Sequence, residues 1–314
     1  MRIISLLASA TETIAALGCL DQMVGRSHEC DYPPEVTNLP VVSTVQIDIT
    51  ASSAEIDAQV KQLARKQEVT QDPALKALSI YAIDVAKLQE LRPDVIFTQT
   101  QCEVCAVSER DVTQAIAQLT GLKPRVVSLT PYRLQDVWED ILRVGLVLGK
   151  QDQAQALVAM SQQRLANLAL QTGSFGSKPK VAVLEWLDPL MGTGNWTPEL
   201  VAHAGGQHLF GELGQHSTWL TWEELQAADP DVLILAPCGY TLERTMQDVP
   251  ILQKHLAWAN LQAVRNSRVF ALDGNTYLNR SGPRLVESAE ILASMIWGER
   301  LGTIVDHDGW QRVQ

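Results

Sequence analysis

The chain has 314 residues, of which 46% are hydrophobic and 19% are charged, and its net charge is −11. This length suits two domains that each bury a core, and no apolar run is long enough to embed the chain in a membrane. The acidic balance disfavours a nucleic-acid partner, because phosphate contacts need clustered Lys and Arg. The five cysteines are too few and too scattered for a disulfide framework, so we expect reduced thiols.

The N-terminus indicates the start of a folded domain. Its pattern predicts a strand over 2–7 and a helix over 10–18, with Ser9 or Thr11 as the helix cap. The apolar stretch before the small residues that follow is too short for a signal peptide. A complete chain is therefore expected in the cytoplasm, whereas a chain whose leader has been removed is expected to be exported.

The first domain continues as alternating helices and strands. The capping-box spacing of Ser52 and Glu55 predicts a helix that begins there, and Ser108 predicts the start of another helix. The other predicted elements are a short strand over 22–26, a helix over 85–91, and strands over 94–98 and 125–129.

Residues 134–170 contain almost no helix breaker. Apolar residues recur at helical spacing and proline is absent, which predicts one helix of about 35 residues, or ~50 Å. The alternative is a pair of helices broken near Gly149. A linker rich in Gly and Ser follows at 173–179. We therefore expect an N-terminal lobe over 1–131, a bridging helix over 132–172 and a C-terminal lobe over 173–314.

One phrase occurs twice in the chain. Residues 88–97 read LQELRPDVIF and residues 225–234 read LQAADPDVLI, and each combines a helix end, a Pro-Asp stop and a buried strand. In the second lobe, the sequence pattern predicts strands over 180–185, 231–236 and 268–272. It predicts helices over 197–204, 221–228, 241–256 and 282–299. This alternation predicts an α/β fold of two Rossmann-like lobes, with mainly parallel sheets, joined by the long bridging helix.

The loops that follow the predicted strands are rich in aromatic and polar residues. Ligands of open α/β sheets bind at the C-terminal ends of the strands, so we expect a small-molecule ligand in a cleft between the lobes. Aromatic side chains suit a broad, flat ligand. The candidate ligand-binding residues are Tyr32, Gln101, Trp186, Asp188, Met191, Trp196, Tyr240, Asn275, Tyr277 and Arg280.

Soft side chains occupy the same loops. The candidate metal ligands are His28, Cys30, Cys102, Cys105 and Cys238. A Cys-x-x-Cys pair needs two more ligands to hold zinc, and in the first lobe only His28 and Cys30 could supply them. Three alternatives stay open: buried cysteines that act as small hydrophobes, contact with a metal or metallocofactor, and redox or catalytic thiol chemistry. No nucleophile elbow, P-loop or GxGxxG motif supports an enzyme.

Several segments resemble the helical-backbone (class III) substrate-binding proteins of ABC importers, which bind cobalamin, haem or iron–siderophore chelates. These segments are Arg2–Gly18, Cys30–Pro34 and Asn279–Arg284, and the repeated Pro-Asp phrase fits the same family. The resemblance runs from residue 2 to about residue 300. It looks closest to the cobalamin-binding branch.

The resemblance implies two lobes bridged by one helix, with a corrinoid or another metal chelate as the ligand and no catalytic step. With it, we expect Trp186, Trp196 and Tyr240 to stack on the ligand, Arg280 to pair with an anionic group, and His28 or a cysteine to be an axial metal ligand. An ABC permease would be the partner in import. The resemblance leaves the cysteines unexplained. The alternative is therefore a cytoplasmic metal- or thiol-dependent enzyme that uses His28 and the cleft cysteines on the same scaffold.

Overall fold

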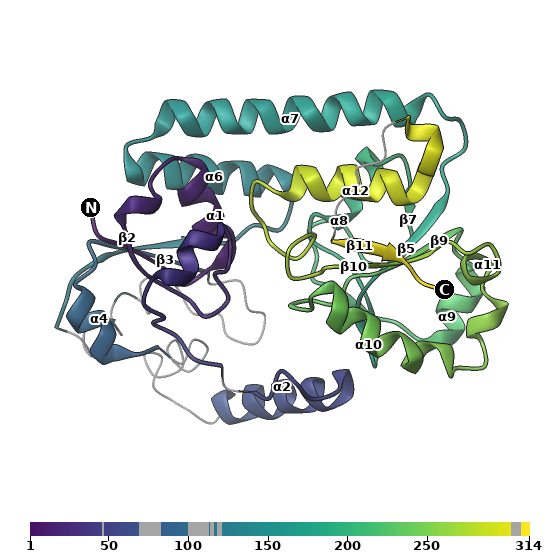
Figure 1. Ribbon diagram of the computed structural model, residues 1–314, viewed down its shortest axis with the longest axis horizontal. Helices are drawn as coiled ribbons and strands as arrows, with labels where there is room; N and C mark the ends of the chain where they lie inside the picture. The colour runs from purple at the N-terminus through teal and green to yellow at the C-terminus, as the bar shows by residue number, and fades with distance from the viewer. Residues whose placement is uncertain (46, 69–82, 100–112, 114–115, 118–120, 303–308) are drawn as a thin grey trace. The chain divides into compact units, whose positions relative to one another are not determined.

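The computed structural model describes residues 1–45, 47–68, 83–99, 113, 116–117, 121–302 and 309–314 (Figure 1). Two compact units divide the chain. Unit 1 comprises Met1–Pro131 and Trp138–Gln155, and unit 2 comprises Tyr132–Val137 and Ala156–Gln314. Each unit has its own β-sheet, so the predicted α/β fold with two lobes is confirmed. The lobe boundaries predicted from the sequence stay a prediction.

Unit 1 contains a four-stranded sheet of order β2-β1-β3-β4, in which all neighbours are parallel. Its elements are β1 (Ile3–Ser5), α1 (Ala8–Ala16), β2 (Met23–Arg26), α2 (Ser53–Glu68), α4 (Val85–Leu91), β3 (Val95–Gln99) and β4 (Arg125–Leu129). The central strands β1 and β3 are buried on both faces, as expected of a parallel sheet that helices cover. Because all four strands are parallel, their C-terminal ends share one edge of the sheet.

The helix starts of unit 1 test two predicted caps. The Ser52–Glu55 capping box is confirmed, because the Ser52 N–H donates to Glu55 Oε2 at 2.9 Å and the Glu55 N–H donates to Ser52 Oγ at 3.4 Å. The predicted cap of α1 is wrong. Leu7 is the N-cap residue and makes no side-chain cap, while Ser9 and Thr11 lie inside the helix. The predicted cap at Ser108 lies outside the described residues.

The predicted single helix over 134–170 is wrong, and the two-helix alternative is confirmed. Helix α6 spans Leu134–Leu148 and α7 spans Gln151–Gly173. Gly149, at φ +66°, supplies the left-handed residue that ends α6, and the Lys150 N–H then donates to the Gly145 carbonyl at 2.7 Å. The α7 helix alone has 23 residues, about 35 Å of helix. Both helices contribute residues to both units.

Unit 2 contains a mixed sheet of order β11-β10-β9-β5-β6-β8, with β7 also paired to β5. Strands β10, β9, β5 and β7 are parallel to one another, whereas β6, β8 and β11 join by antiparallel pairing. The strands are β5 (Lys180–Leu187), β6 (Leu190–Gly192), β7 (Gln207–His208), β8 (Thr218–Trp219), β9 (Val232–Leu235), β10 (Val269–Leu272) and β11 (Trp310–Arg312). The helices are α8 (Thr197–His203), α9 (Trp222–Ala228), α10 (Leu242–Gln253), α11 (Gln262–Arg265) and α12 (Leu285–Trp297).

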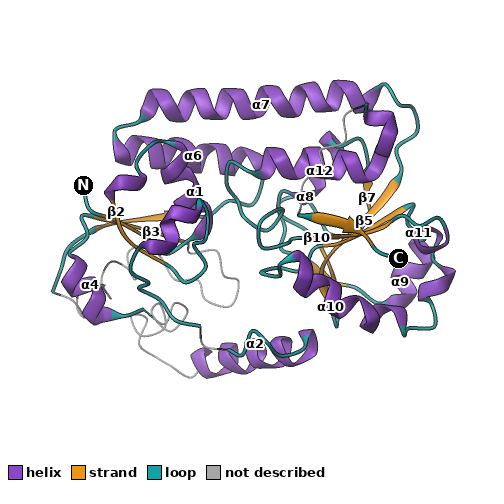
Figure 2. Ribbon diagram, in the orientation of Figure 1, coloured by secondary structure: helices purple, strands orange, loops and turns teal. Residues whose placement is uncertain are grey.

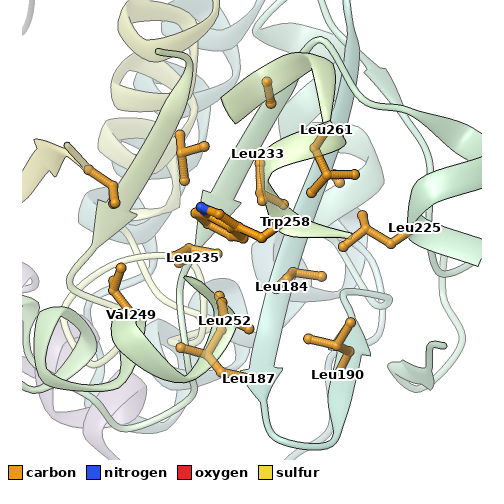
Figure 3. Close-up of a cluster of buried hydrophobic side chains, with 14 of the residues drawn as sticks. Leu184, Leu187, Leu190, Leu225, Leu233, Leu235, Val249, Leu252, Trp258 and Leu261 are labelled. Carbon is orange, nitrogen blue, oxygen red and sulfur yellow. The ribbon is translucent and has the colours of Figure 1, made fainter. Parts of the chain in front are cut away.

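The core of unit 2 lies against its central parallel strands. Figure 2 shows α10 and α12 on opposite sides of these strands. A cluster of buried apolar side chains fills the space between strands and helices, among them Leu184, Leu233, Leu252 and Trp258 (Figure 3). Most of these side chains are less than 4% exposed, so their burial gives the strand ends of β5 and β9 a rigid base.

The repeated Pro-Asp phrase forms the same structure in both units. Arg92 and Asp229 each adopt a left-handed conformation that ends a helix, and the strand begins three residues later. Asp94 Oδ2 then accepts the N–H of Arg2 beside β1, and Asp231 Oδ2 accepts the N–H of Lys180 at the start of β5, each at 2.7 Å. The phrase therefore fixes neighbouring strands together at the N-terminal edge of each sheet.

Candidate functional site

Three parallel strands of unit 2 end beside one another, and the predicted site residues follow them. Strands β5, β9 and β10 are neighbours, so the segments after Glu185, after Leu235 and after Leu272 emerge at one edge. Backbone hydrogen bonds join these segments, because the Cys238 N–H donates to the Glu185 carbonyl at 3.0 Å and the Asn275 N–H donates to the Tyr240 carbonyl at 2.9 Å. The structure therefore brings these three loops into one site.

Two of the predicted stacking residues contact each other. The rings of Trp186 and Tyr240 meet edge to face, with centroids 5.2 Å apart and an interplanar angle of 61°. The Arg244 guanidinium lies 4.6 Å from the centre of the Tyr240 ring and forms an ion pair with the buried Asp248 at 2.5 Å. Because Asp248 holds Arg244 and Arg244 covers the ring, the Tyr240 side chain has a defined orientation.

Strand pairing places two more apolar side chains next to Trp186 and Tyr240. In β5, β6 and β8, Trp186 is registered with Met191, and Met191 is registered with Trp219. Directly opposed residues of antiparallel strands share one face of the sheet, so Trp186, Met191 and Trp219 lie side by side on it. About 10 Å, or two strand spacings, separate Trp186 from Trp219. We call Tyr240, Trp186, Met191 and Trp219 the aromatic row.

Trp219 was missed by the sequence analysis. Its side chain is 51% exposed on a strand that has only Thr218 and Trp219, and such a short strand has no alternation pattern to detect. A single exposed apolar side chain is ordinary on a protein surface, whereas apolar side chains that adjoin one another in a patch are typical of a binding surface. Trp219 joins the aromatic row because it is paired with Met191, and only the folded sheet shows this pairing.

Polar groups adjoin the row at its Tyr240 end. Arg280, which is 8% exposed, donates from Nη2 to Asn275 Oδ1 at 2.9 Å. The amide of Asn279 donates to the carbonyls of Ala236 and Gly274 at 3.1 and 3.0 Å. These bonds hold the loop after β10 against the loop after β9, so Asn275 and Arg280 are placed beside Tyr240.

Three other predicted contact residues have structural surroundings of their own. Trp196 is 7% exposed and donates from Nε1 to the Leu278 carbonyl at 2.7 Å. The ring of Tyr277 is buried beside Gly309, whose added Cβ would meet it at 2.4 Å. Asp188 is exposed, and its carbonyl accepts the Trp186 indole N–H at 3.1 Å. Contact of Trp196, Tyr277 or Asp188 with a ligand stays a prediction.

Glu185 directly precedes Trp186 in β5 and is the extra residue of a β-bulge. Leu184 is paired with Gly192 and Trp186 with Met191, so β5 advances by two residues where β6 advances by one. The Ser217 hydroxyl donates to Glu185 Oε2 at 2.6 Å. Burial raises the pKa of the Glu185 carboxyl above its ordinary value of 4.5, although the Ser217 bond and the nearby His216 oppose that rise.

The raised pKa of the Glu185 carboxyl makes the stability of the protein depend on pH. A carboxyl whose pKa is higher in the folded chain binds its proton more tightly there, so stability falls as pH rises through the window between 4.5 and the folded-state pKa. Glu185→Gln lacks this penalty. We expect its melting temperature to equal that of the wild type at pH 4 and to exceed it increasingly as the pH rises through that window.

Calorimetry of both proteins over this pH range measures the difference. The buried His208, whose pKa burial lowers, is common to both proteins and cancels in the comparison. A difference that shrinks as pH rises would contradict the prediction.

In unit 1, the predicted metal ligands have separate environments. The His28 Nδ1 lies 2.8 Å from the Ser43 hydroxyl, whereas the thiol of the fully buried Cys30 lies 3.0 Å from the Thr11 hydroxyl. Tyr32 is 44% exposed. Within the described residues, no group of three or more His, Cys, Asp and Glu side chains could hold a metal ion. Gln101, Cys102 and Cys105 lie outside those residues.

Cys238 of unit 2 is exposed, in the turn that leads to Tyr240. Metal ligation by His28 or by any of these cysteines stays a prediction. For the part of the chain that the structure describes, no helix combines the length and the apolar character needed to cross a bilayer.

Comparison with known proteins identifies the family. A family model described as "Periplasmic binding protein" matches residues 3–276. The vitamin B12-binding protein of Vibrio cholerae is 23% identical over 299 residues, which cover 92% of this chain and 86% of that protein. An uncharacterized ABC transporter substrate-binding lipoprotein of Bacillus subtilis is 22% identical over 306 residues, which cover 94% of this chain and 80% of that protein.

A solved structure agrees with this relationship. The periplasmic heme-binding protein of Roseiflexus, in its apo form, superimposes with a TM-score of 0.65 and 22% identity, covering 95% of this chain and 98% of the other. At that identity the similarity concerns the fold. The family model matches most of the chain, and this chain belongs to the periplasmic binding protein family.

Proposed function

We propose that this protein is the ligand-binding component of an ABC importer and that its ligand is a corrinoid or another flat metal chelate. The observation that carries the proposal is the aromatic row at the strand ends of unit 2, in which Trp219 is half exposed and Tyr240 is buried at one end. Its three aromatic side chains have few rotatable bonds and a large contact area, so they lose little entropy on binding a rigid ring system. No catalytic step is part of the proposal.

The polar end of the row suits the rim of such a ligand. Metal chelates of this class have an apolar face and carboxylate or amide groups at the periphery. The Arg280 guanidinium and the Asn275 amide lie beside Tyr240, where they supply a positive charge and hydrogen-bond donors. The relatives support the ligand class, since one is named a vitamin B12-binding protein and another a heme-binding protein. The permease partner is inferred from the lipoprotein relative.

Titration of the purified protein with cyanocobalamin and with hemin tests this proposal. One of the two is expected to change its visible spectrum with a 1:1 end point and to raise the melting temperature, because a ligand at 100 times its Kd stabilises the folded chain by about 2.7 kcal/mol. Metal-free protoporphyrin is the control that separates stacking on the aromatic row from ligation of the metal. If neither chelate changes its spectrum or the melting temperature, the proposed ligand class is wrong.

A further inference from the structure

We propose that Glu185 is the positioning residue of the aromatic row: it contacts each of the three segments that carry the ring side chains and sets their spacing. The inference deepens the proposed function and rests on it for ligand affinity, but the ring positions can be tested without a ligand. Glu185 itself is not proposed to touch the ligand.

The first segment is its own strand. Glu185 is the bulged residue of β5, and the bulge shifts the register so that Trp186 stands opposite Met191. A strand without this extra residue would turn the next side chain to the other face of the sheet, because side chains alternate along a strand. The bulge therefore decides which face presents Trp186.

The second segment carries Tyr240. The backbone carbonyl of Glu185 accepts the Cys238 N–H at 3.0 Å, and the Tyr240 N–H closes the same turn on the Pro237 carbonyl at 3.1 Å. The Cys238 bond attaches the loop after β9 to the bulge, next to Trp186. The edge-to-face contact of Trp186 and Tyr240 depends on that attachment.

The third segment carries Trp219. The Glu185 carboxyl accepts the Ser217 hydroxyl at 2.6 Å, and Ser217 Oγ in turn accepts the Gly194 N–H at 3.1 Å. Ser217 is 8% exposed and lies two residues before Trp219. The neighbouring backbone is tightly packed, since a Cβ on Gly194 would lie 2.2 Å from the Gln215 carbonyl. Loss of the hydrogen bond between the Glu185 carboxyl and Ser217 should therefore displace β8, because the tightly packed backbone leaves no free space for Ser217 to move alone.

Ring positions can be measured by fluorine NMR of protein labelled with fluorotryptophan. The chain has eight tryptophans, and Trp186→Phe and Trp219→Phe assign the two signals of interest. Glu185→Ala and Ser217→Ala are each expected to shift the Trp219 signal, because each removes the hydrogen bond between the carboxyl and Ser217. Glu185→Gln keeps an acceptor for Ser217 and is expected to leave the Trp186 and Trp219 signals unchanged.

Ligand affinity gives the second measurement. With the chelate that the wild type binds, Glu185→Ala is expected to weaken binding about tenfold, the effect of losing a hydrogen bond to a carboxyl, and Ser217→Ala about threefold. Glu185→Gln should retain the wild-type Kd within about twofold. The matched control is Asp231→Ala, which removes a carboxylate that links loops at the opposite end of β5 and β9. It should lower the melting temperature but leave Kd and both tryptophan signals unchanged.

The outcomes separate this inference from the proposed function. If the wild type binds neither chelate, the proposed function fails, and the NMR signals still decide the role of Glu185. If Glu185→Ala leaves the Trp219 signal unchanged, or if Asp231→Ala shifts it equally, the inference is overturned. If Glu185→Ala does not fold, Ser217→Ala decides: a shifted Trp219 signal supports the role of Glu185, and an unchanged one overturns it.

Discussion

Replacing Trp186 and Trp219 together with alanine is expected to weaken chelate binding about a hundredfold. Each indole supplies a large rigid face, and the loss of one aromatic contact costs roughly 1.4 kcal/mol, or tenfold in Kd. The two residues are separated by two strand spacings, about 10 Å, and do not pair with each other, so the two losses should be nearly additive. Absorbance titration of the double variant and of each single variant measures the effect.

The matched control for this experiment is Trp222→Ala. Trp222 stacks on His255 with ring centres 4.0 Å apart, and it packs against the core cluster of unit 2 rather than in the aromatic row. Its removal should lower the melting temperature and leave Kd unchanged, whereas the half-exposed Trp219 should show the reverse. A double variant that binds within about threefold of the wild type, less than the loss of one aromatic contact, would show that the row is not the ligand-binding surface.

Gly274→Ala is expected to be the most destabilising single change near the site, at about 2–4 kcal/mol. A Cβ at this position would lie 2.1 Å from the Pro237 carbonyl oxygen and 2.8 Å from that of Ala236. Both are backbone atoms, so the loop after β10 must move away from the loop after β9. That movement breaks the Asn279 bonds and displaces Asn275, so affinity should also fall about tenfold.

Two glycines serve as controls for the Gly274 experiment. A Cβ on Gly239 meets no atom within 4 Å, but its φ of +76° is unfavourable for alanine, which predicts a loss of about 1 kcal/mol. Gly173 has open space and no positive φ, so Gly173→Ala at the end of α7 should be close to neutral. Chemical denaturation ranks the three variants. The packing argument fails if Gly274→Ala costs no more than Gly239→Ala.

Elements with strong local signals were predictable from the sequence. The Pro-Asp phrase predicted both helix ends and the strands that follow, since a proline stop and an apolar β-branched run act within ten residues. The strand Arg125–Leu129 was predicted to the residue. The break at Gly149 was weighed but not preferred, because a single glycine ends a helix only when the next turn finds a capping bond, as the Lys150 N–H does here.

The site was predictable only in part, because its geometry depends on pairing between short strands. Trp186 and Tyr240 were identified from their places after buried strands, and they do contact each other. Trp219 was missed, since β6 and β8 have three and two residues and no periodicity. The bulge at Glu185, on which its proposed role depends, could not be predicted either, because a bulge is a relation between two paired strands rather than a property of one strand.

The two equivalent aspartate hydrogen bonds, of Asp94 in unit 1 and Asp231 in unit 2, have a consequence for how such proteins can diversify. Asp94 and Asp231 secure their strands from the edge opposite the loops that carry the aromatic row and His28. The strands of each sheet are thus held together at one edge, while in the proposed function the loops at the other edge select the ligand. Substitutions at one edge of a sheet need not disturb the other edge. The same fold can therefore bind a new ligand when only the loops at the C-terminal ends of its strands change.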